Sequence, residues 1–234
     1  MKFLALLMTF VVCVSFARAE TVTGEGYEQK TNFGKKLFDL DIKVDRAEGL
    51  TKTTAIYKDL KGQPTVEEKG VVKGDELISF DVDQRQIREK GHIEVQGDRV
   101  FFTYEKDGKK KTAEEKLKKP FLTPANFNLY VSNHWADFAG GKEVEVRFAV
   151  WFRLETVGFK IFKVGETLKG SQKLIQLRMK PSSFVIAALV DPLNLWYTED
   201  GQKLMELSGR VSTMLPQGDD FKDLDADVRY IHHN

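Results

Sequence analysis

Apolar and polar side chains alternate along several stretches of this chain, and this period of two restricts its fold more than any other feature. From Phe38 to Val44 every second residue is apolar, and the residues between them are charged. The segments Glu143–Arg153 and Lys222–Ile231 alternate in the same way. Because successive side chains of a strand point to opposite faces, each segment is predicted to be an antiparallel strand with one buried and one hydrated face.

Short glycine-containing turns separate the candidate strands. Asp107-Gly108 is the strongest of them, because Asp-Gly between two strand-like segments is typical of a tight hairpin. The predicted turns are Lys61-Gly62, Lys73-Gly74-Asp75, Lys90-Gly91, Gln96-Gly97-Asp98, Asp107-Gly108, Gly140-Gly141, Lys169-Gly170 and Asp200-Gly201. Together they predict an all-β fold, a single antiparallel, strongly curved sheet in up-and-down order that forms an open or a closed barrel.

One short helix is expected near residues 124–137, where Pro124 suits the first helical turn. The chain has no glycine-rich nucleotide-binding loop and no alternation of strands with helices, which excludes doubly wound α/β folds. We expect residues 20–234 to form one domain. A subdivision into two domains near residues 119–124 is the alternative.

Residues 1–19 are predicted to be a cleaved signal peptide. Lys2 supplies a positive charge, residues 3–16 are almost entirely apolar, and Ala17 and Ala19 are small residues of the kind that signal peptidase recognises. Cleavage before Glu20 would place residues 20–234 in the periplasm or outside the cell. A buried N-terminal helix and an uncleaved anchor are the alternatives.

Cysteine and charge counts exclude several kinds of protein. Cys13 is the only cysteine, so the mature chain is expected to be free of disulfides. Lipidation of Cys13 is not expected, because Phe10-Val11-Val12 lacks the small residues of a lipoprotein signal. The 36 basic and 35 acidic side chains nearly balance, which argues against nucleic acid as a partner.

No metal site, cofactor or catalytic residue is predicted. The four histidines do not have the spacing of a zinc site. The aspartates of residues 219–227 resemble a calcium loop, but Val228 and Asn234 occupy the positions where that loop needs Gly and Glu. The chain also lacks the nucleophile motif of a serine hydrolase, so an enzyme is not favoured.

Seven lysines and three acidic residues lie between Lys106 and Lys119. Lys109, Lys110 and Lys111 could contact anionic headgroups at a membrane surface. The alternative is a solubilising hairpin or an edge strand whose lysines prevent pairing with another sheet.

Arg147, Trp151 and Arg153 are the candidate ligand-binding residues, together with Trp196. The alternation in Glu143–Arg153 places the first three on the face opposite the aliphatic one. Two arginines and an indole lining an interior could hold an anionic headgroup through bidentate hydrogen bonds. The alternative is that they point to solvent or form ion pairs with neighbours such as Glu145 and Glu155.

From Phe127 onward the chain resembles uncharacterised exported β-barrel proteins, domains of unknown function with a lipoprotein-carrier (Lol-type) half-barrel architecture. The matching features are the short helix at 124–137, Gly140-Gly141 before Arg147-Phe-Ala-Val-Trp151, the strand Val157–Phe162, and the hairpin Leu195–Leu204 with its Asp200-Gly201 turn. The resemblance covers about half of the mature chain and implies no catalytic residues.

These observations rank three functions. The first is a non-enzymatic periplasmic β-barrel protein that binds an apolar or amphipathic, lipid-like ligand or supports the cell envelope. The second is a structural or protein-interaction module that uses a sheet edge or an aromatic patch. The third is a hydrolase, and the oligomeric state is not indicated.

Overall fold

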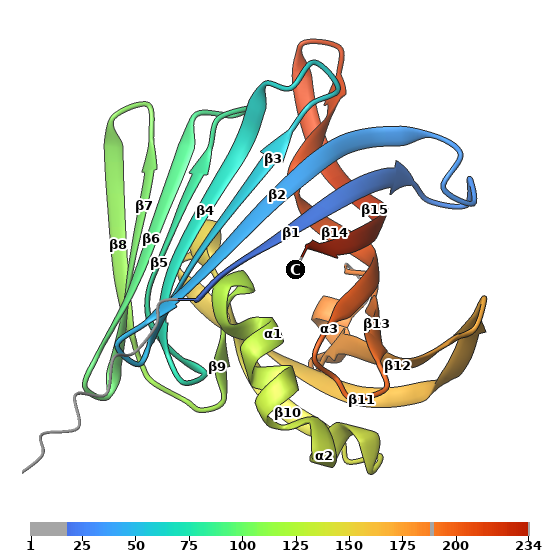
Figure 1. The fold of residues 1–234 in the computed structure, drawn as a ribbon. Helices are drawn as coiled ribbons and strands as arrows, with labels where there is room; N and C mark the ends of the chain where they lie inside the picture. Colours follow the sequence, from blue (N-terminus) through green and yellow to red (C-terminus); the bar gives the residue numbers. More distant parts are fainter. Residues whose placement is uncertain (1–17, 188–189, 234) are drawn as a thin grey trace, which may run out of the picture.

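The computed structural model describes residues 18–187 and 190–233, so the predicted signal peptide lies almost entirely outside the described residues. Strands of one sheet surround the helix α1 (Pro124–Asn133) in Figure 1. The strands of the first half are β1 (Arg18–Glu28), β2 (Lys36–Ala47), β3 (Leu50–Lys58), β4 (Pro64–Lys73), β5 (Glu76–Gln84), β6 (Glu89–Gln96), β7 (Arg99–Lys106) and β8 (Lys109–Lys116). Those of the second half are β9 (Phe121–Leu122), β10 (Val144–Val150), β11 (Glu155–Lys169), β12 (Gln172–Pro181), β13 (Leu193–Thr198), β14 (Leu204–Gln217) and β15 (Asp220–His233).

All fifteen strands belong to one sheet, and nearly every strand pairs with its neighbours in sequence. The order runs from β8 to β1, continues from β1 to β15, and then runs back from β15 to β9. Every pairing is antiparallel except that of β9 with β10. The prediction of an all-β fold with an antiparallel, up-and-down sheet is therefore confirmed. The short parallel pair of β9 and β10 was not predicted.

Strands that are distant in the sheet order contact each other through their side chains. The backbone register between β14 and β15 shifts between Arg210 and Met214, which marks a bulge in β14. From this bulge the Ser212 carbonyl accepts a 2.7 Å hydrogen bond from Gln84 Nε2 of β5, and the Met214 carbonyl accepts one of 2.9 Å from Gln86 Nε2. The sheet thus bends back until β14 contacts β4 directly and β5 through Gln84.

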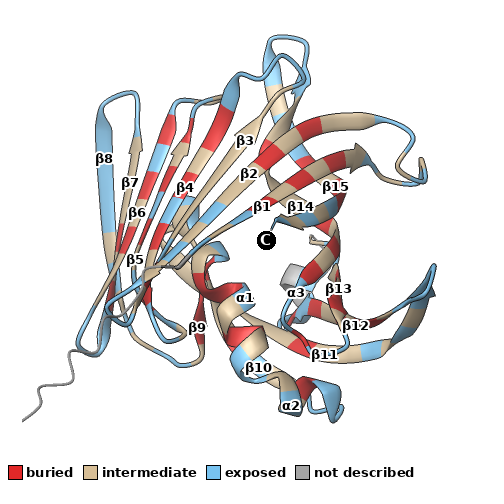
Figure 2. Cartoon of the chain, in the orientation of Figure 1, coloured by how far each residue is buried: buried red, intermediate tan, exposed pale blue. Residues whose placement is uncertain are grey.

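The inner face of the sheet follows the predicted alternation. Phe38 and Leu40 of β2 are buried, and the buried residues in Figure 2 form bands on the strands and on α1. On the neighbouring strand β1 the inner positions include Gly24 and Gly26. A Cβ atom at Gly26 would lie 2.1 Å from the Phe38 ring, so this glycine makes room for an aromatic core side chain.

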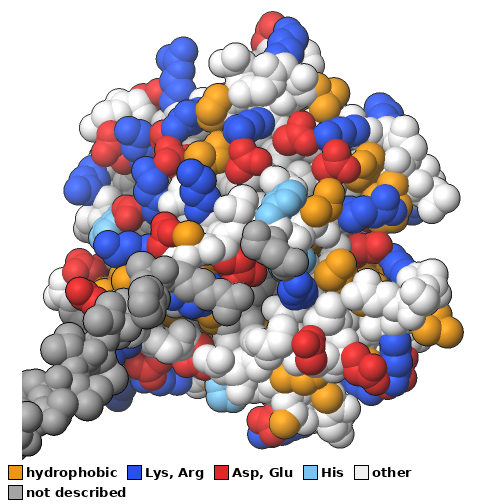
Figure 3. Space-filling view, in the orientation of Figure 1, with side chains coloured by type: hydrophobic (Ala, Val, Ile, Leu, Met, Phe, Trp, Pro, Cys, Tyr) orange, Lys and Arg blue, Asp and Glu red, His pale blue; other side chains and the backbone are white. Residues whose placement is uncertain are grey.

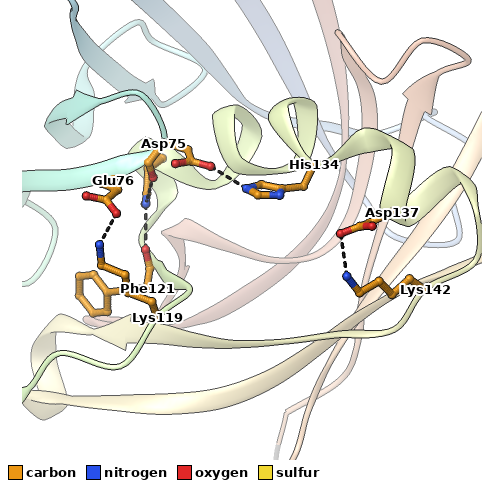
Figure 4. Close-up of polar contacts among 8 residues, drawn as sticks. Asp75, Glu76, Lys119, Phe121, His134, Asp137 and Lys142 are labelled. Carbon is orange, nitrogen blue, oxygen red and sulfur yellow. Dashed lines mark hydrogen bonds and ion pairs between the residues drawn. The ribbon is translucent and has the colours of Figure 1, made fainter.

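The predicted helical segment forms two helices, α1 and α2 (Trp135–Ala139), with a break at His134. Before α1, the Thr123 amide donates a 2.7 Å hydrogen bond to Asn126 Oδ1. Asn126 Nδ2 donates to the carbonyl oxygens of Asp75 and Phe121, both at 2.9 Å. His134 Nε2 lies 2.9 Å from the Asp75 carboxylate (Figure 4), so the turn between β4 and β5 holds both ends of α1.

Two sequence predictions are wrong in detail. β10 ends at Val150, and residues 151–153 form a 3₁₀ turn that ends at Leu154 in the left-handed region (φ 58°). The side chains of Trp151 and Arg153 therefore do not continue the alternation that starts at Val144. Gly91 was predicted to lie in a turn, but it lies within β6, while the chain reverses at residues 85–88. The single-domain boundaries remain a prediction.

Candidate functional site

A cavity of about 690 Å³ lies between α1 and the inner face of the sheet. Its walls come from β1–β5, α1, β10 and β12–β15, so nearly the whole chain contributes to it. We call it the central cavity. Most of its lining is apolar, with Ile42, Leu129, Phe148, Leu193 and Leu207 among the side chains that face it.

One patch of the cavity wall is polar and comes from four different strands. Glu68 of β4 is buried, and the Ser212 hydroxyl of the β14 bulge donates a 2.6 Å hydrogen bond to Glu68 Oε1. Tyr57 of β3 and Tyr230 of β15 also line the cavity. The pairing of Tyr57 with Leu40, of Leu40 with Gly24, and of Gly24 with Tyr230 places both tyrosines at one level of the inner face. We call these four residues the Glu68 cluster.

Burial changes the acid–base properties of the Glu68 cluster. Desolvation raises the pKa of Glu68 from 4.5 to about 7, and the hydrogen bond from Ser212 opposes this rise. Burial also raises the pKa values of Tyr57 and Tyr230, and the negative charge of Glu68 raises both further. Among the described residues no basic side chain forms an ion pair with Glu68.

A second set of polar side chains lies where β1, β2 and β15 begin or end. Arg46 Nη1 donates a 2.9 Å hydrogen bond to Glu20, and His232 Nδ1 lies 3.7 Å from the other carboxylate oxygen of Glu20. The pKa of Glu20 is lowered, because the favourable interactions with Arg46 and His232 together outweigh its desolvation. Lys203 is exposed and also lines the cavity. The cavity therefore has a mixed-charge rim in addition to the acidic Glu68 cluster.

The structure places the four predicted ligand-binding residues in different surroundings, and none of them lines the central cavity. Arg147 donates hydrogen bonds of 3.1 and 2.7 Å to the Thr156 hydroxyl. That hydroxyl donates to Glu115 of the end strand β8 at 2.7 Å. Arg147 thus belongs to a network that joins β10, β11 and β8.

Trp151 packs against the inner faces of β6 and β7. Its ring stacks on that of Tyr104 with the centroids 6.1 Å apart. It also covers Gly91, where a Cβ atom would lie only 2.6 Å from Trp151 Cε3. The glycine predicted to make a turn instead provides space for an indole ring.

Arg153 and Trp196 lie elsewhere. Arg153 forms a 2.6 Å ion pair with Glu155 and is about half exposed, which is the alternative that the sequence left open. Trp196 lies on the opposite face of β13 from Leu195, and Lys169 Nζ lies 5.2 Å from the centre of its ring. The structure does not bring the four residues together, and their role in ligand binding remains a prediction.

The lysine-rich hairpin predicted around Asp107-Gly108 is confirmed as β7 and β8. Lys109, Lys110 and Lys111 are exposed on β8, the strand at one end of the sheet. On the face drawn in Figure 3 basic and acidic side chains are interspersed. No helix in the described part of the chain is long and apolar enough to span a membrane.

Sequence reasoning missed the Glu68 cluster, although one signal for it exists. In β4 the inner positions are Val66, Glu68, Gly70 and Val72, so Glu68 is an acidic residue in register with buried valines. A charged residue on the apolar face of a strand is unusual enough to single out. Tyr57 lies on the preceding strand β3, but Ser212 and Tyr230 could not be assigned to Glu68, because they come from strands far away in sequence.

No family model and no curated protein matches this chain. Among solved structures, a beta-barrel-like protein of the domain of unknown function DUF1849 from Brucella abortus superposes with a TM-score of 0.54. The alignment covers 92% of this chain and 96% of that protein at 9% sequence identity. The chain has the fold of this DUF1849 protein. The resemblance to uncharacterised β-barrel domains that the sequence suggested is therefore confirmed for the fold.

Two other solved structures align less closely. A domain described as an outer membrane lipoprotein-sorting protein from Vibrio parahaemolyticus has a TM-score of 0.29 and 7% identity, over 93% of this chain and 83% of that one. A porin-like protein from Bacteroides uniformis has a TM-score of 0.30 and 10% identity, over 91% and 97%. These two TM-scores are too low to support a functional argument.

Proposed function

We propose that this chain is an exported, non-enzymatic binding protein that holds an amphipathic, lipid-like molecule in its central cavity. The observation that carries the proposal is the cavity itself, whose volume of about 690 Å³ is within the range of small-molecule sites, about 300–1,000 Å³. Its walls are mostly apolar, and polar groups are present at the Glu68 cluster, at the rim and along α1, where Asn128, Ser132 and Asn133 line the cavity. This arrangement matches a ligand with an apolar body and a polar group.

The way the interior is filled supports the same proposal. Small barrels usually fill their interior with side chains, and a barrel that keeps a cavity commonly uses it for a ligand. Here α1 occupies part of the interior, and Tyr197 Oη donates a 2.6 Å hydrogen bond to Asn128 of this helix. The helix leaves the space beside β1–β3 and β14–β15 unfilled.

Export and membrane contact belong to the same proposal. A signal peptide at residues 1–19 would direct the chain out of the cytoplasm, and its cleavage would release the mature chain. An exported chain meets the lipids of the cell envelope. The exposed Lys109, Lys110 and Lys111 would add roughly 1 kcal/mol each near an anionic membrane surface. Reversing all three charges should therefore weaken binding to anionic vesicles while leaving neutral vesicles unaffected.

A cavity-filling variant tests the proposal directly. Ala55 of β3 lines the cavity, and the adjacent Thr54 alternates to the other face of the strand. We expect Ala55→Phe to reduce binding of a neutral fluorescent probe such as N-phenyl-1-naphthylamine at least tenfold. Thr54→Phe, the matched control, should bind the probe as the wild type does.

Two results would overturn the proposal. One is a wild-type protein that does not bind the probe and yields no amphipathic molecule on extraction with organic solvent. The other is equal probe binding by wild type and by a folded Ala55→Phe protein. Either result would favour the alternative in which the sheet serves as a structural or protein-interaction module.

A further inference from the structure

Glu68 is a buried carboxylate in a cavity whose lining is mostly apolar, and no basic side chain of the described residues forms an ion pair with it. Its relative exposure is 6%, and one oxygen accepts the hydrogen bond from Ser212. The other oxygen, Oε2, has no hydrogen-bond partner among the described residues and belongs to a side chain that lines the cavity. Burying a charge without a partner is costly, so such a group either takes up a proton or pairs with a counter-ion or ligand.

The two arginines that line the cavity, Arg46 and Arg210, already form ion pairs with carboxylates of other residues. Arg210 of β14 bonds the carboxylates of Asp223 and Asp225 on β15, the latter at 2.9 Å. Arg46 at the rim bonds Glu20. Neither guanidinium is available to Glu68 without breaking these pairs, which leaves the position opposite Glu68 for a cation from outside the chain.

Aromatic rings surround the same part of the cavity. Tyr57 and Tyr230 share one level of the inner face, and Phe80 of β5 also lines the cavity. On β3 the residue paired with Glu68 is Ala55, two positions from Tyr57, so the carboxylate and this ring are diagonal neighbours on one face. A carboxylate beside aromatic faces is the combination that recognises organic ammonium groups, through ion pairing and cation–π attraction.

We propose that the Glu68 cluster binds the ammonium head of an amphipathic amine or quaternary ammonium compound, with Glu68 as counter-ion and Tyr57 and Tyr230 as aromatic walls. The apolar part of the ligand then lies along the cavity wall toward the rim. This assignment rests on the function proposed above and names the chemical class of its ligand. An anionic head is excluded from the cluster by the charge of Glu68, and a neutral head lacks the ion pair.

Three ligands with the same chain test the assignment: decylammonium, decan-1-ol and decanoate, each titrated by calorimetry below its aggregation limit. At pH 8 we expect decylammonium to bind at least tenfold more tightly than either of the others. In Glu68→Gln this preference should fall to within about twofold, while the affinity for decan-1-ol is retained. Glu67→Gln, on the outer face of the same strand, should keep the full preference.

A pH series provides a second readout in the wild-type protein. Between pH 8 and pH 5.5 the amine stays protonated, and Tyr57 and Tyr230, with raised pKa values, stay neutral. Glu68 gains its proton in this interval, so the preference for decylammonium should decrease at the lower pH. The other charged and titratable residues of the cavity lining are common to the wild type and Glu68→Gln, so the difference between the two proteins isolates Glu68; they are Glu20, Arg46, Lys203, Arg210, His232 and His233.

The outcomes separate the two proposals. If the chain binds decan-1-ol but shows no preference for decylammonium, or prefers decanoate, the ammonium assignment is wrong and the cavity function stands. If none of the three binds and the probe does not bind, the cavity function itself is wrong. Should Glu68→Gln fail to fold, an unchanged preference at pH 5.5 in the wild type would also overturn the assignment.

Discussion

Thr65 of β4 and Thr213 of the β14 bulge are 148 residues apart in sequence, and their hydroxyl oxygens lie 2.9 Å apart in a buried hydrogen bond. This contact joins two strands that do not pair in the sheet. It lies beside the bonds that Gln84 and Gln86 donate to backbone carbonyl oxygens of the same bulge. The bulge therefore both closes the sheet against β4 and β5 and places Ser212 beside Glu68.

Replacing one of these threonines should destabilise the fold. Thr213→Val removes this hydrogen bond and the one from the Thr213 hydroxyl to Gln86 Oε1, while the Thr65 hydroxyl keeps its 3.2 Å bond to the Tyr57 carbonyl. Each lost hydrogen bond costs about 0.5–1.5 kcal/mol of unfolding free energy. The double variant Thr65→Val/Thr213→Val should lose less stability than the two single variants added together, because the bond between the two hydroxyls is removed only once. Urea unfolding measures both, with Thr112→Val on the exposed strand β8 as the control. If the loss of unfolding free energy in the double variant equals the sum of the losses in the two single variants, Thr65 and Thr213 do not interact.

Gly91→Ala should disturb the packing of Trp151. The new Cβ atom would lie 2.6 Å from Trp151 Cε3 and 2.8 Å from Val82 Cγ1, so the indole must move. Overpacking of this kind costs about 1–3 kcal/mol. Gly165→Ala in β11 is the matched control, since a Cβ atom there meets nothing within 4 Å. Near-ultraviolet circular dichroism and urea unfolding report the effect, and equal stability of the two variants would contradict the packing argument.

Asn126→Ala should loosen the attachment of α1. The amide group bonds the Thr123 amide and the carbonyl oxygens of Asp75 and Phe121, so its removal leaves several polar groups without partners. At about 1–3 kcal/mol for each buried group, we expect a total loss of at least about 2 kcal/mol. Asn133→Ala, at the end of the same helix, is the control for helix content. Hydrogen exchange of the α1 amides should rise in Asn126→Ala and stay nearly constant in the control.

The pKa of Glu68 predicts a pH dependence of stability. In the folded protein it is raised to about 7 from 4.5, so between these values the folded state binds more protons than the unfolded state. The free energy of unfolding should therefore fall as the pH rises from about 4.5 to 7. The contribution of this one group is on the order of 3 kcal/mol when the full shift is converted at 1.36 kcal/mol per unit.

Glu68→Gln removes this contribution. The difference in unfolding free energy between Glu68→Gln and wild type should change in favour of the variant as the pH rises through this interval. Glu67→Gln should show almost no change over this interval, because the hydrogen bond and ion pair with Lys69 lower the pKa of Glu67 from 4.5 and its contribution to stability therefore changes only at lower pH. Urea unfolding at pH 5 and pH 8 measures both variants. If the difference in unfolding free energy between Glu68→Gln and wild type is the same at both pH values, the pKa of Glu68 is not raised in the folded protein.

The N-terminus of the exported protein should be Glu20. Expression of the full chain in a host that secretes it, followed by intact-mass measurement, would check this. Ala19→Leu places a large residue at the predicted cleavage site and should slow processing, whereas Thr21→Leu on the other side should not. A mature chain that begins at Met1 would support the uncleaved alternative. In that case residues 1–19 would remain attached to Glu20, whose side chain lies at the cavity rim.

Local sequence patterns were sufficient to predict several strands, one hairpin and the start of the helix. Alternating side chains identified β2 and β15 because burial on one face of a strand imposes a period of two whatever the strand pairs with. Asp107-Gly108 identified a hairpin because the two residues adopt positive φ angles, 50° and 73°, that few other pairs adopt without strain. The helix after Pro124 followed from similar local preferences, although the break at His134 did not.

Predictions failed where a residue serves a distant partner. Gly91 has the local properties of a turn residue, but it lies in a strand because Trp151, sixty positions further along the chain, needs the space above it. The same ring was expected to face a ligand, and the 3₁₀ turn that follows Val150 directs it into the core instead. The positions of Gly91 and Trp151 could not be predicted correctly without knowing that the two residues contact each other.

The amino-acid sequence therefore contains the class of the fold, the direction of the strands and the polarity of each face, since these depend on neighbours a few residues apart. The cavity and its chemistry depend on which strands meet. Tyr57, Glu68, Ser212 and Tyr230 lie on four strands, and the strand register together with the bend of the sheet brings them into one wall. Only the tertiary structure decides this, because a one-residue change of register would turn each side chain to the opposite face.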